Sequence, residues 1–443
     1  MEIPTNSQAC HSFDKSYTQK LAVARPESYK QLFRFLDAPD QKLIARGAGL
    51  SYAPASFVED GVSVSSELFN RVLCFDKDKG VVCCEPGIRL YDLLSVVNAN
   101  GWTLSVLPGY PSISVGGCIA FNIHGKSQFH TGNFSDCIKS LKLYHPSHGE
   151  LDCNHSENVS TYELTIGGMG LTGFITEVEL QLSPLNYRSI ALSKKKVNNI
   201  YEGIEFLTNE AENYKAVYSW HNFMSTGSSF GNGIVYCEQN SDKVVKAKPY
   251  NGFKTSASKP LPLNLLNYFT TGMMNRVYQL KDRLGGTDNL VDIAAGSFPI
   301  YGKEIYYALF GKQGFLEYQF IASFDKIKPL LKEIEQWVRT NKQPVSLASL
   351  KLFKGDQSLL NFCGTGVCLA LDVPNNKKAH SFFDFLDDLC TSSSSIMNIA
   401  KDSRLTQRTV EAVYPEYGKF KDRLLAFDGK KIFSSEVRNR LEL

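Results

Sequence analysis

Three glycine-rich segments in the first 175 residues restrict the fold of this chain more than any other feature of its sequence. They read ARGAGLSY at 45–52, LPGYPSISVGGCIAFNIHGK at 107–126 and TIGGMGLTGF at 165–174. Glycine lets the backbone approach a ligand closely, and successive N–H groups can form a nest that binds an anion. One glycine-rich turn is common in proteins, but three of them predict a backbone folded around a large, phosphate-bearing cofactor.

Rival patterns in the same region are weaker. His124 and His130 lie six residues apart between Cys118 and Cys137, a spacing that matches no common zinc site. No GxGxxG motif opens a helix and no GxxxxGK[ST] motif occurs, so neither a Rossmann fingerprint nor a P-loop is indicated. The sequence therefore predicts no metal site.

Length and charge narrow the class of protein. A chain of 443 residues predicts two domains, and a net charge of +3 without a basic block argues against nucleic-acid binding. The N-terminus lacks the apolar core of a signal peptide, and no apolar run is long enough to span a membrane. Eleven cysteines without a CxxC pair are typical of a reducing compartment. The expected location is the cytoplasm.

Hydrophobic spacing predicts an α+β fold. In the first part of the chain, strands are expected in two hairpins at 71–84 and 140–153, at 102–107, at the end of CIAF (118–121) and along the alternating segment 175–182, with a helix at 90–97. Later segments mix longer helices with strands: a helix at 327–338, a buried strand at 368–373 and a helix at 380–389.

The stretch 246–284 is less regular. It contains KPLPLNLLNYFTTGMMNRVYQL, which is apolar but interrupted by Asn, Thr and Arg. Two interpretations stay open: a helical cover over a core, or a mobile lid or membrane-surface segment.

Several motifs resemble those of the vanillyl-alcohol-oxidase-type flavoproteins, which carry a PCMH-type FAD-binding domain. They are RGAGLSY, LPGYPSISVGGCIAFNIHGKSQFHTGNF, GGMGLTGFI, AKDSR and FSSEVRNRLEL. Within that family they are most similar to the polyprenyl-phosphoryl-ribose oxidases, and the resemblance runs from about residue 14 to the C-terminus. It implies an FAD-binding domain at 1–186, a substrate domain with an antiparallel sheet flanked by helices at 187–395, and a segment at 396–443 that returns to the FAD-binding domain.

The resemblance also implies which residues hold the FAD. The predicted set is Ala45, Arg46, Gly47, Ala48, Gly49, Leu50, Ser51, Tyr52, Pro108, Gly109, Ser114, Val115, Gly116, Gly117, Phe121, Asn122, Ile123, His124, Gly125, Ile175 and Asn398. Relatives with a covalent flavin often carry a histidine in the first glycine loop, where this chain has Leu50. We therefore expect noncovalent FAD.

The catalytic residues implied in the same way are Lys401 and Tyr52. Lys401 could act as a base towards a substrate hydroxyl, or as a cation that stabilises the reduced flavin or binds a phosphate; the sequence leaves both open. The implied substrate residues are Lys126, Gln319, Lys351, Phe353 and Ala370. Two positions depart from the resembling enzymes: Ala370 stands where a cysteine is usual, and Asn398 where a tyrosine is usual.

These residues together predict an FAD-dependent oxidoreductase acting on CH–OH groups. Its expected reaction is oxidation of the ribose 2′-hydroxyl of a polyprenyl-phosphoryl-ribose to a keto sugar, the first half of an epimerisation of a cell-wall or polysaccharide precursor. The expected partners are a sugar or lipid-linked sugar substrate, an NAD(P)H-dependent short-chain reductase and the inner face of the membrane as a peripheral contact. The alternatives are an aldonolactone- or alditol-type sugar oxidase and a non-catalytic flavin-binding protein.

Overall fold

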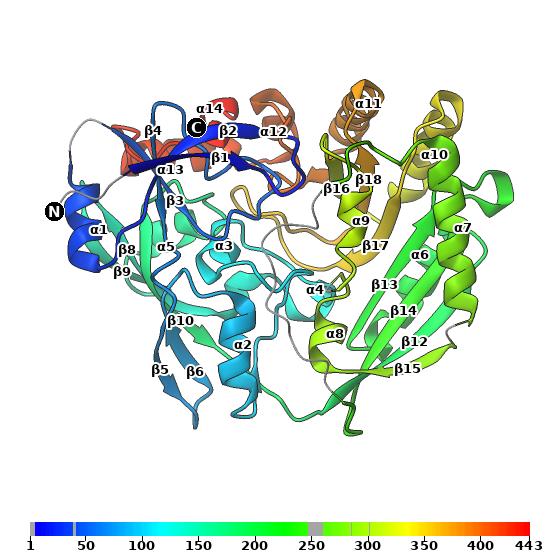
Figure 1. Cartoon of the computed structure of the whole chain (residues 1–443), viewed down its shortest axis with the longest axis horizontal. Coiled ribbons are helices and arrows are strands. Elements are labelled where there is room, and N and C mark those ends of the chain that lie inside the picture. The colour runs from blue at the N-terminus through cyan, green and yellow to red at the C-terminus, as the bar shows by residue number, and fades with distance from the viewer. Residues whose placement is uncertain (1–4, 39–40, 247–259, 285, 301) are drawn as a thin grey trace.

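The computed structural model of the chain describes residues 5–38, 41–246, 260–284, 286–300 and 302–443. Figure 1 shows two halves side by side, one built from the blue and cyan part of the chain and the other from the green and yellow part. Helices accompany sheets in both halves, and most strand pairs are antiparallel, so the predicted α+β class is confirmed.

The first half contains two main sheets. The order of the four-stranded sheet is β1 (Thr5–His11), β2 (Thr18–Ala24), β4 (Gly61–Ser65) and β3 (Lys42–Arg46). The order of the five-stranded antiparallel sheet is β5 (Val72–Asp76), β6 (Val81–Cys84), β10 (Phe174–Gln181), β8 (Ile138–His145) and β9 (Gly149–Asn154). A short pair, β7 (Trp102–Thr103) with β11 (Ser183–Pro184), lies beside them.

The helices of this half include α1 (Tyr29–Leu36), α2 (Leu90–Asn98), α3 (Val115–Ala120), α4 (Gln128–Thr131) and α5 (Val159–Thr165). The inner face of α2, with Leu90, Leu93, Leu94 and Val97, packs into one core with the five-stranded sheet and α3. That core supports α3 from below, and α3 carries the glycine pair of the second glycine-rich segment.

The second half is an eight-stranded antiparallel sheet. Its order is β15 (Asp288–Val291), β12 (Ser189–Val197), β14 (Asn232–Ser241), β13 (Ala216–Asn222), β17 (Leu347–Phe353), β18 (Gly366–Pro374), β16 (Phe315–Ala322) and β19 (Ile396–Met397). One face packs in the largest core against α6 (Ile200–Glu210), α10 (Ile327–Asn341) and α11 (Lys377–Ser393). On the other face lie α7 (Tyr268–Leu284), α8 (Ile293–Ser297) and α9 (Ile305–Ala308).

The C-terminal segment returns to the first half, where Figure 1 shows the C-terminus close to β1 and β2. It contains α12 (Gln407–Val413), α13 (Tyr417–Phe427) and α14 (Glu436–Arg440). Backbone hydrogen bonds of 2.8 Å join Leu43 of β3 to Ile432 and Ser434. Arg438, only 1% exposed, forms a 2.9 Å ion pair with Asp428. The functional division at 186 and 396 stays a prediction.

Local sequence signals predicted most of these elements. Both hairpins, the alternating strand and the helices at 90–97, 327–338 and 380–389 are confirmed as β5–β6, β8–β9, β10, α2, α10 and α11, and the strand at 368–373 as part of β18. The strand end expected in CIAF is wrong, because this run lies in α3, whose N-cap Ser114 accepts a hydrogen bond from the Gly117 N–H. The strand expected at 102–107 is reduced to the two residues of β7.

Two further expectations bear on the surface of the molecule. Residues 268–284 of the irregular stretch form α7, while 247–259 lie outside the described residues. None of the helices in the described part of the chain has both the length and the hydropathy to cross a membrane.

Candidate active site

All three glycine-rich segments meet at α3. The Ser114 hydroxyl, at the start of α3, accepts hydrogen bonds of 3.3 Å from the backbone of Gly117 and of Ala48 in the first segment. A Cβ on Gly47 would lie 2.2 Å from the Ser114 Oγ, so only glycine permits this approach. The third segment closes on the other end of α3, because the Gly167 and Met169 N–H groups donate to the carbonyls of Ile119 and Ala120 at 2.8 and 2.7 Å.

This cradle fits an FAD diphosphate. Among the described residues, the Ser51 and Ser112 hydroxyls are buried without a hydrogen-bond partner, and both lie in the glycine-rich loops. A buried polar group without a partner costs about 1–3 kcal/mol, which an acceptor such as a phosphate oxygen would offset. The residues that would hold the group are therefore those of 45–52 and 108–117.

The other predicted cofactor residues lie around α3 as well. Asn122 follows the helix in the left-handed region at φ 42°, and its side chain accepts a hydrogen bond from Ser135 N–H at 2.8 Å. Ile123 and Ile175 pack against the same core as α3. A Cβ on Gly125 would lie 2.5 Å from the Leu107 carbonyl oxygen, so this position also needs glycine.

Lys401 and Tyr52, the two predicted catalytic residues, are in contact. The Lys401 Nζ lies 3.7 Å from the centroid of the Tyr52 ring. It also lies 3.3 Å from Oε2 of Glu317, in β16. A hydrogen bond of 3.1 Å from Ala53 N–H to the Ala400 carbonyl ties the lysine's loop to the first glycine loop. Lys401 therefore lies where the cofactor cradle meets the eight-stranded sheet.

Acidic and phenolic groups behind this contact bind their protons more tightly than usual. Burial, followed by the charge of Glu317, raises the pKa of Tyr52 well above its usual range. Burial, again followed by Glu317, raises the pKa of Asp372 well above its usual range. Asp372 lies opposite Glu317 in the β16–β18 pair and accepts a 3.0 Å hydrogen bond from the Tyr306 hydroxyl. Glu317 is therefore the carboxylate of this group that is aimed at a cation.

His124 lies in an aromatic corner of the same site. Its ring centroid is 4.8 Å from that of Phe353 and 5.4 Å from that of Phe362. Burial, followed by the charges of Lys351 and Lys401, lowers the pKa of His124 well below its usual range. The imidazole is thus neutral, and two of the three lysines predicted from the sequence, Lys351 and Lys401, are close enough to affect it.

Strand register brings three of the predicted substrate residues, Gln319, Lys351 and Ala370, onto one face of the sheet. Gln319 pairs with Ala370, and Ala370 also pairs with Ser349. Lys351 pairs with Cys368 on one side and with Tyr218 on the other. Asn398 is fixed beside them, since its side chain donates to Gln319 Oε1 at 2.6 Å.

A second group of cations lies at the other end of this face. The Lys126 Nζ is 2.5 Å from Oε1 of Glu238, and it also donates to the Gly296 carbonyl. The Tyr218 hydroxyl donates to the same Glu238 oxygen at 3.2 Å. Lys215 lies nearby and donates to the Tyr187 hydroxyl at 2.7 Å.

Burial perturbs all three lysines of this region. It lowers the pKa of Lys126, against the opposing effect of Glu238, and it lowers the pKa of Lys351. Burial, followed by the charge of Lys126, lowers the pKa of Lys215 to about 8. In the described part of the chain, Lys215 and Lys351 form no ion pair. At this end of the face, Lys215 and Lys351 could therefore bind an anionic ligand.

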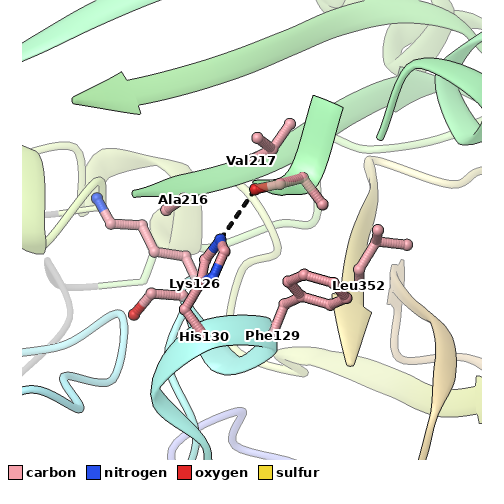
Figure 2. Close-up of a pocket in the computed structure, with 8 residues that line it drawn as sticks. Lys126, Phe129, His130, Ala216, Val217 and Leu352 are labelled. Carbon is pink, nitrogen blue, oxygen red and sulfur yellow. Dashed lines mark hydrogen bonds between the residues drawn. The ribbon is translucent and has the colours of Figure 1, made fainter. Parts of the chain in front are cut away.

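A small cavity lies beside Lys126. It is lined by Lys126, Ser127, Phe129, His130, Ala211, Ala216, Val217 and Leu352. Figure 2 shows the amine of Lys126 directed away from Phe129 and Leu352, while the His130 ring reaches the Ala211 carbonyl at 2.9 Å. Val217 and Leu352 belong to the core on the opposite side of the sheet. We assign no ligand to this cavity.

Glu238, Asp372, Lys215 and a role for Glu317 were missed from the sequence. A signal was present for both carboxylates, since Asp372 interrupts the fully buried strand β18 and Glu238 ends the buried apolar run of β14. A buried carboxylate usually has a partner. Their partners are far away in sequence and are found only from the fold. Among the described residues, no group of three His, Cys, Asp or Glu side chains is arranged to hold a metal ion.

Comparison with known proteins agrees with the glycine cradle. A family model described as an FAD binding domain matches residues 21–153. The chain is 25% identical to the decaprenylphosphoryl-β-D-ribose oxidase of Mycolicibacterium smegmatis, in an alignment of 461 positions that covers 100% of this chain and 99% of the relative. It is 30% identical over 148 residues to the L-gulonolactone oxidase of Mus musculus, or 33% of each chain. It is 32% identical over 168 residues to an uncharacterised FAD-linked oxidoreductase of Mycobacterium tuberculosis, or 36% of each chain.

These findings confirm two predictions made from the sequence. The resemblance to the ribose oxidases extends over the whole chain, and FAD is the cofactor. Noncovalent attachment and the roles of single residues stay predictions.

Proposed function

We propose that this chain, an FAD-dependent oxidoreductase, oxidises the 2′-hydroxyl of a polyprenyl-phosphoryl-ribose to a ketone. An NAD(P)H-dependent short-chain reductase would then complete the epimerisation. The full-length similarity to decaprenylphosphoryl-β-D-ribose oxidase supports this substrate class. The observation that carries the proposal is one sheet face with two distinct ends, a Lys401–Glu317 pair beside the glycine cradle and a group of buried lysines farther along.

The reaction removes a hydride from C2′ and a proton from its hydroxyl. The glycine cradle of 45–52 and 108–117 would hold the FAD, which would supply an acceptor for the hydride and its two electrons. The Lys401–Glu317 pair takes the proton: the ammonium stabilises negative charge on the oxygen, and the carboxylate is the acceptor. Tyr52 packs under the lysine and keeps its own proton, because its pKa is raised. Its part is to hold Lys401 in place.

The lysine group at the other end of the face would bind the substrate phosphate. Lys126 and Lys351 are the predicted substrate lysines, and Lys215 joins them in the fold. A lysine ammonium is a compact point charge on a flexible stem, so it can bind a phosphate without fixing its orientation. The rest of the ligand would then set the position of the phosphate. Gln319 and Ala370 pair on the face between the two ends, where the ribose would lie.

Flavin reduction tests the proposal directly. Purified, FAD-loaded protein is mixed with polyprenyl-phosphoryl-ribose without oxygen, and the flavin absorbance is followed before and after an artificial electron acceptor is added. We expect bleaching by the phosphorylated substrate and recovery with the acceptor. If an aldonolactone bleaches the flavin and the lipid-linked ribose does not, the protein is instead a lactone-type oxidase. If no sugar reduces the flavin, the catalytic proposal is wrong and flavin binding alone remains.

A further inference from the structure

Helix α7 buries its polar face and exposes its apolar face to solvent. Its buried face is polar: Thr271 and Asn275 are fully buried, and Asn275 donates to the Asn222 side chain at 3.0 Å. Its solvent-facing side is apolar: Phe269 is 72% exposed, Met273 50%, Val277 62% and Leu280 56%. A helix on the surface of a globular protein normally has the opposite arrangement.

The apolar surface continues beyond the helix. Leu263 and Leu265, just before α7, are also exposed. Their segment is held against α9 by a 2.9 Å hydrogen bond from Leu265 N–H to the Leu309 carbonyl, and α9 presents the exposed Ile305. We call the set Leu263, Leu265, Phe269, Met273, Val277, Leu280 and Ile305 the α7 surface. A contiguous exposed patch of large apolar side chains marks an interaction site.

Exposed cations border this surface. Arg276 and Lys281 are exposed on α7 itself. Lys303 is exposed beside Ile305, and the acidic residues next to this surface in the sequence are Asp282 and Glu304. An apolar helix face bordered by cations is complementary to the interface of an anionic bilayer, where apolar side chains enter the acyl boundary and cations remain at the headgroups.

We propose that the α7 surface docks the protein on an anionic lipid bilayer. The same segment reaches the active site from within: Leu266 packs in one cluster with Tyr307, Phe310 and Phe315, and Tyr52 lies against that cluster. The layer that would rest on the membrane therefore also covers the residue that supports Lys401. This inference is independent of the sugar oxidised, because docking requires neither substrate nor turnover.

Co-sedimentation with vesicles tests the proposal on the FAD-loaded protein. The wild-type chain is compared with the double variant Phe269→Glu/Val277→Glu on vesicles of equal parts phosphatidylglycerol and phosphatidylcholine, and on phosphatidylcholine alone. Both positions are exposed and lie outside the active site, so the flavin content should not change. The control is Leu425→Glu, which places the same charge on an exposed leucine of α13.

We expect wild-type protein and the Leu425→Glu control to sediment with the anionic vesicles, with binding weakened by salt. The double variant should bind at least about tenfold more weakly, since two apolar anchors are lost and two like charges are added. Equal binding of wild type and double variant, or no binding by wild type, would overturn the proposal. So would a concentration-dependent dimer in light scattering that the double variant abolishes, because the surface would then join two copies of the chain.

Discussion

Replacing Glu317 by glutamine is the sharpest test of how Lys401, the proposed catalytic lysine, is held. The change keeps the shape of the side chain and removes one charge. In the structure the Lys401 Nζ lies 3.3 Å from Oε2 of Glu317, and the carboxylate is 11% exposed against 26% for the lysine. Glu317 is also fixed from behind, because it pairs with Asp372 across the sheet. The variant therefore removes the partner of Lys401 without opening space around it.

The size of the effect follows from the burial of the pair. Removing one partner of a buried, hydrogen-bonded charge pair costs about 2–5 kcal/mol. Lys401 is about a quarter exposed, so water offsets part of the loss and the lower end, about 2–3 kcal/mol, applies. At roughly 1.4 kcal/mol for each factor of ten, the rate of flavin reduction should fall about 30- to 150-fold.

Single-turnover flavin reduction under anaerobic conditions measures this rate, with Lys401→Met and the double variant completing a cycle. If the two residues act as one unit, the double variant should be little slower than Lys401→Met alone. Glu333→Gln, on the exposed side of α10, is the matched control and should leave the rate unchanged. A Glu317→Gln enzyme within about twofold of wild type, or strictly additive losses in the cycle, would refute the assignment of the proton acceptor to this pair.

Three further predictions concern the cofactor and the stability of the fold. Gly47→Ala should lose FAD, measured as the flavin-to-protein absorbance ratio, because its Cβ would lie 2.2 Å from the Ser114 Oγ, whereas Gly418→Ala, with open space around it, should retain FAD. Burial raises the pKa of Asp14 from 3.8 to about 6, so the folded state is favoured when this carboxyl is protonated and loses that contribution as the pH rises through about 6. In urea unfolding above that pH, Asp14→Asn should therefore be about 3 kcal/mol more stable than wild type, and the gain should vanish towards pH 3.8. Arg438→Met should lower the free energy of unfolding by about 3–5 kcal/mol, because it leaves a buried carboxylate without its partner.

Local signals made most of the fold readable from the sequence. The hairpin β8–β9 follows from apolar runs on either side of a Pro/Ser/His/Gly turn, and α10 follows from its 3.6-residue spacing. The run CIAF was misread because its two preceding glycines disfavour a helix in isolation. Tertiary contacts override that preference: α3 is capped by Ser114, and its Val115, Cys118 and Ile119 side chains are buried in the core.

Only those parts of the site that depend on a single sequence segment could be predicted from the sequence. The density of glycines alone predicted the cradle, because a glycine-rich loop allows the backbone to approach a neighbour closely, whichever segment that neighbour comes from. The neighbours of a lysine cannot be obtained in that way. Lys126 is paired with Glu238, 112 residues farther along, and Lys401 with Glu317, 84 residues earlier. Neither separation carries any periodic signal, so these pairs became visible only when the antiparallel register of the large sheet was known.

The buried lysines bear on the choice between a phosphorylated and a free sugar. Burial lowers the pKa of Lys126, Lys215 and Lys351, which means that the folded protein binds these three protons less tightly than water-exposed lysines would. Burying a charged lysine removes its hydration and destabilises the folded state. For Lys126, the ion pair with Glu238 offsets this loss. A neutral lactone would leave the other two ammonium groups without a counter-charge. A phosphate monoanion or diester would supply one, and it would raise the three pKa values as it bound. The charge distribution on the sheet therefore favours a phosphorylated substrate over the lactone of the alternative function.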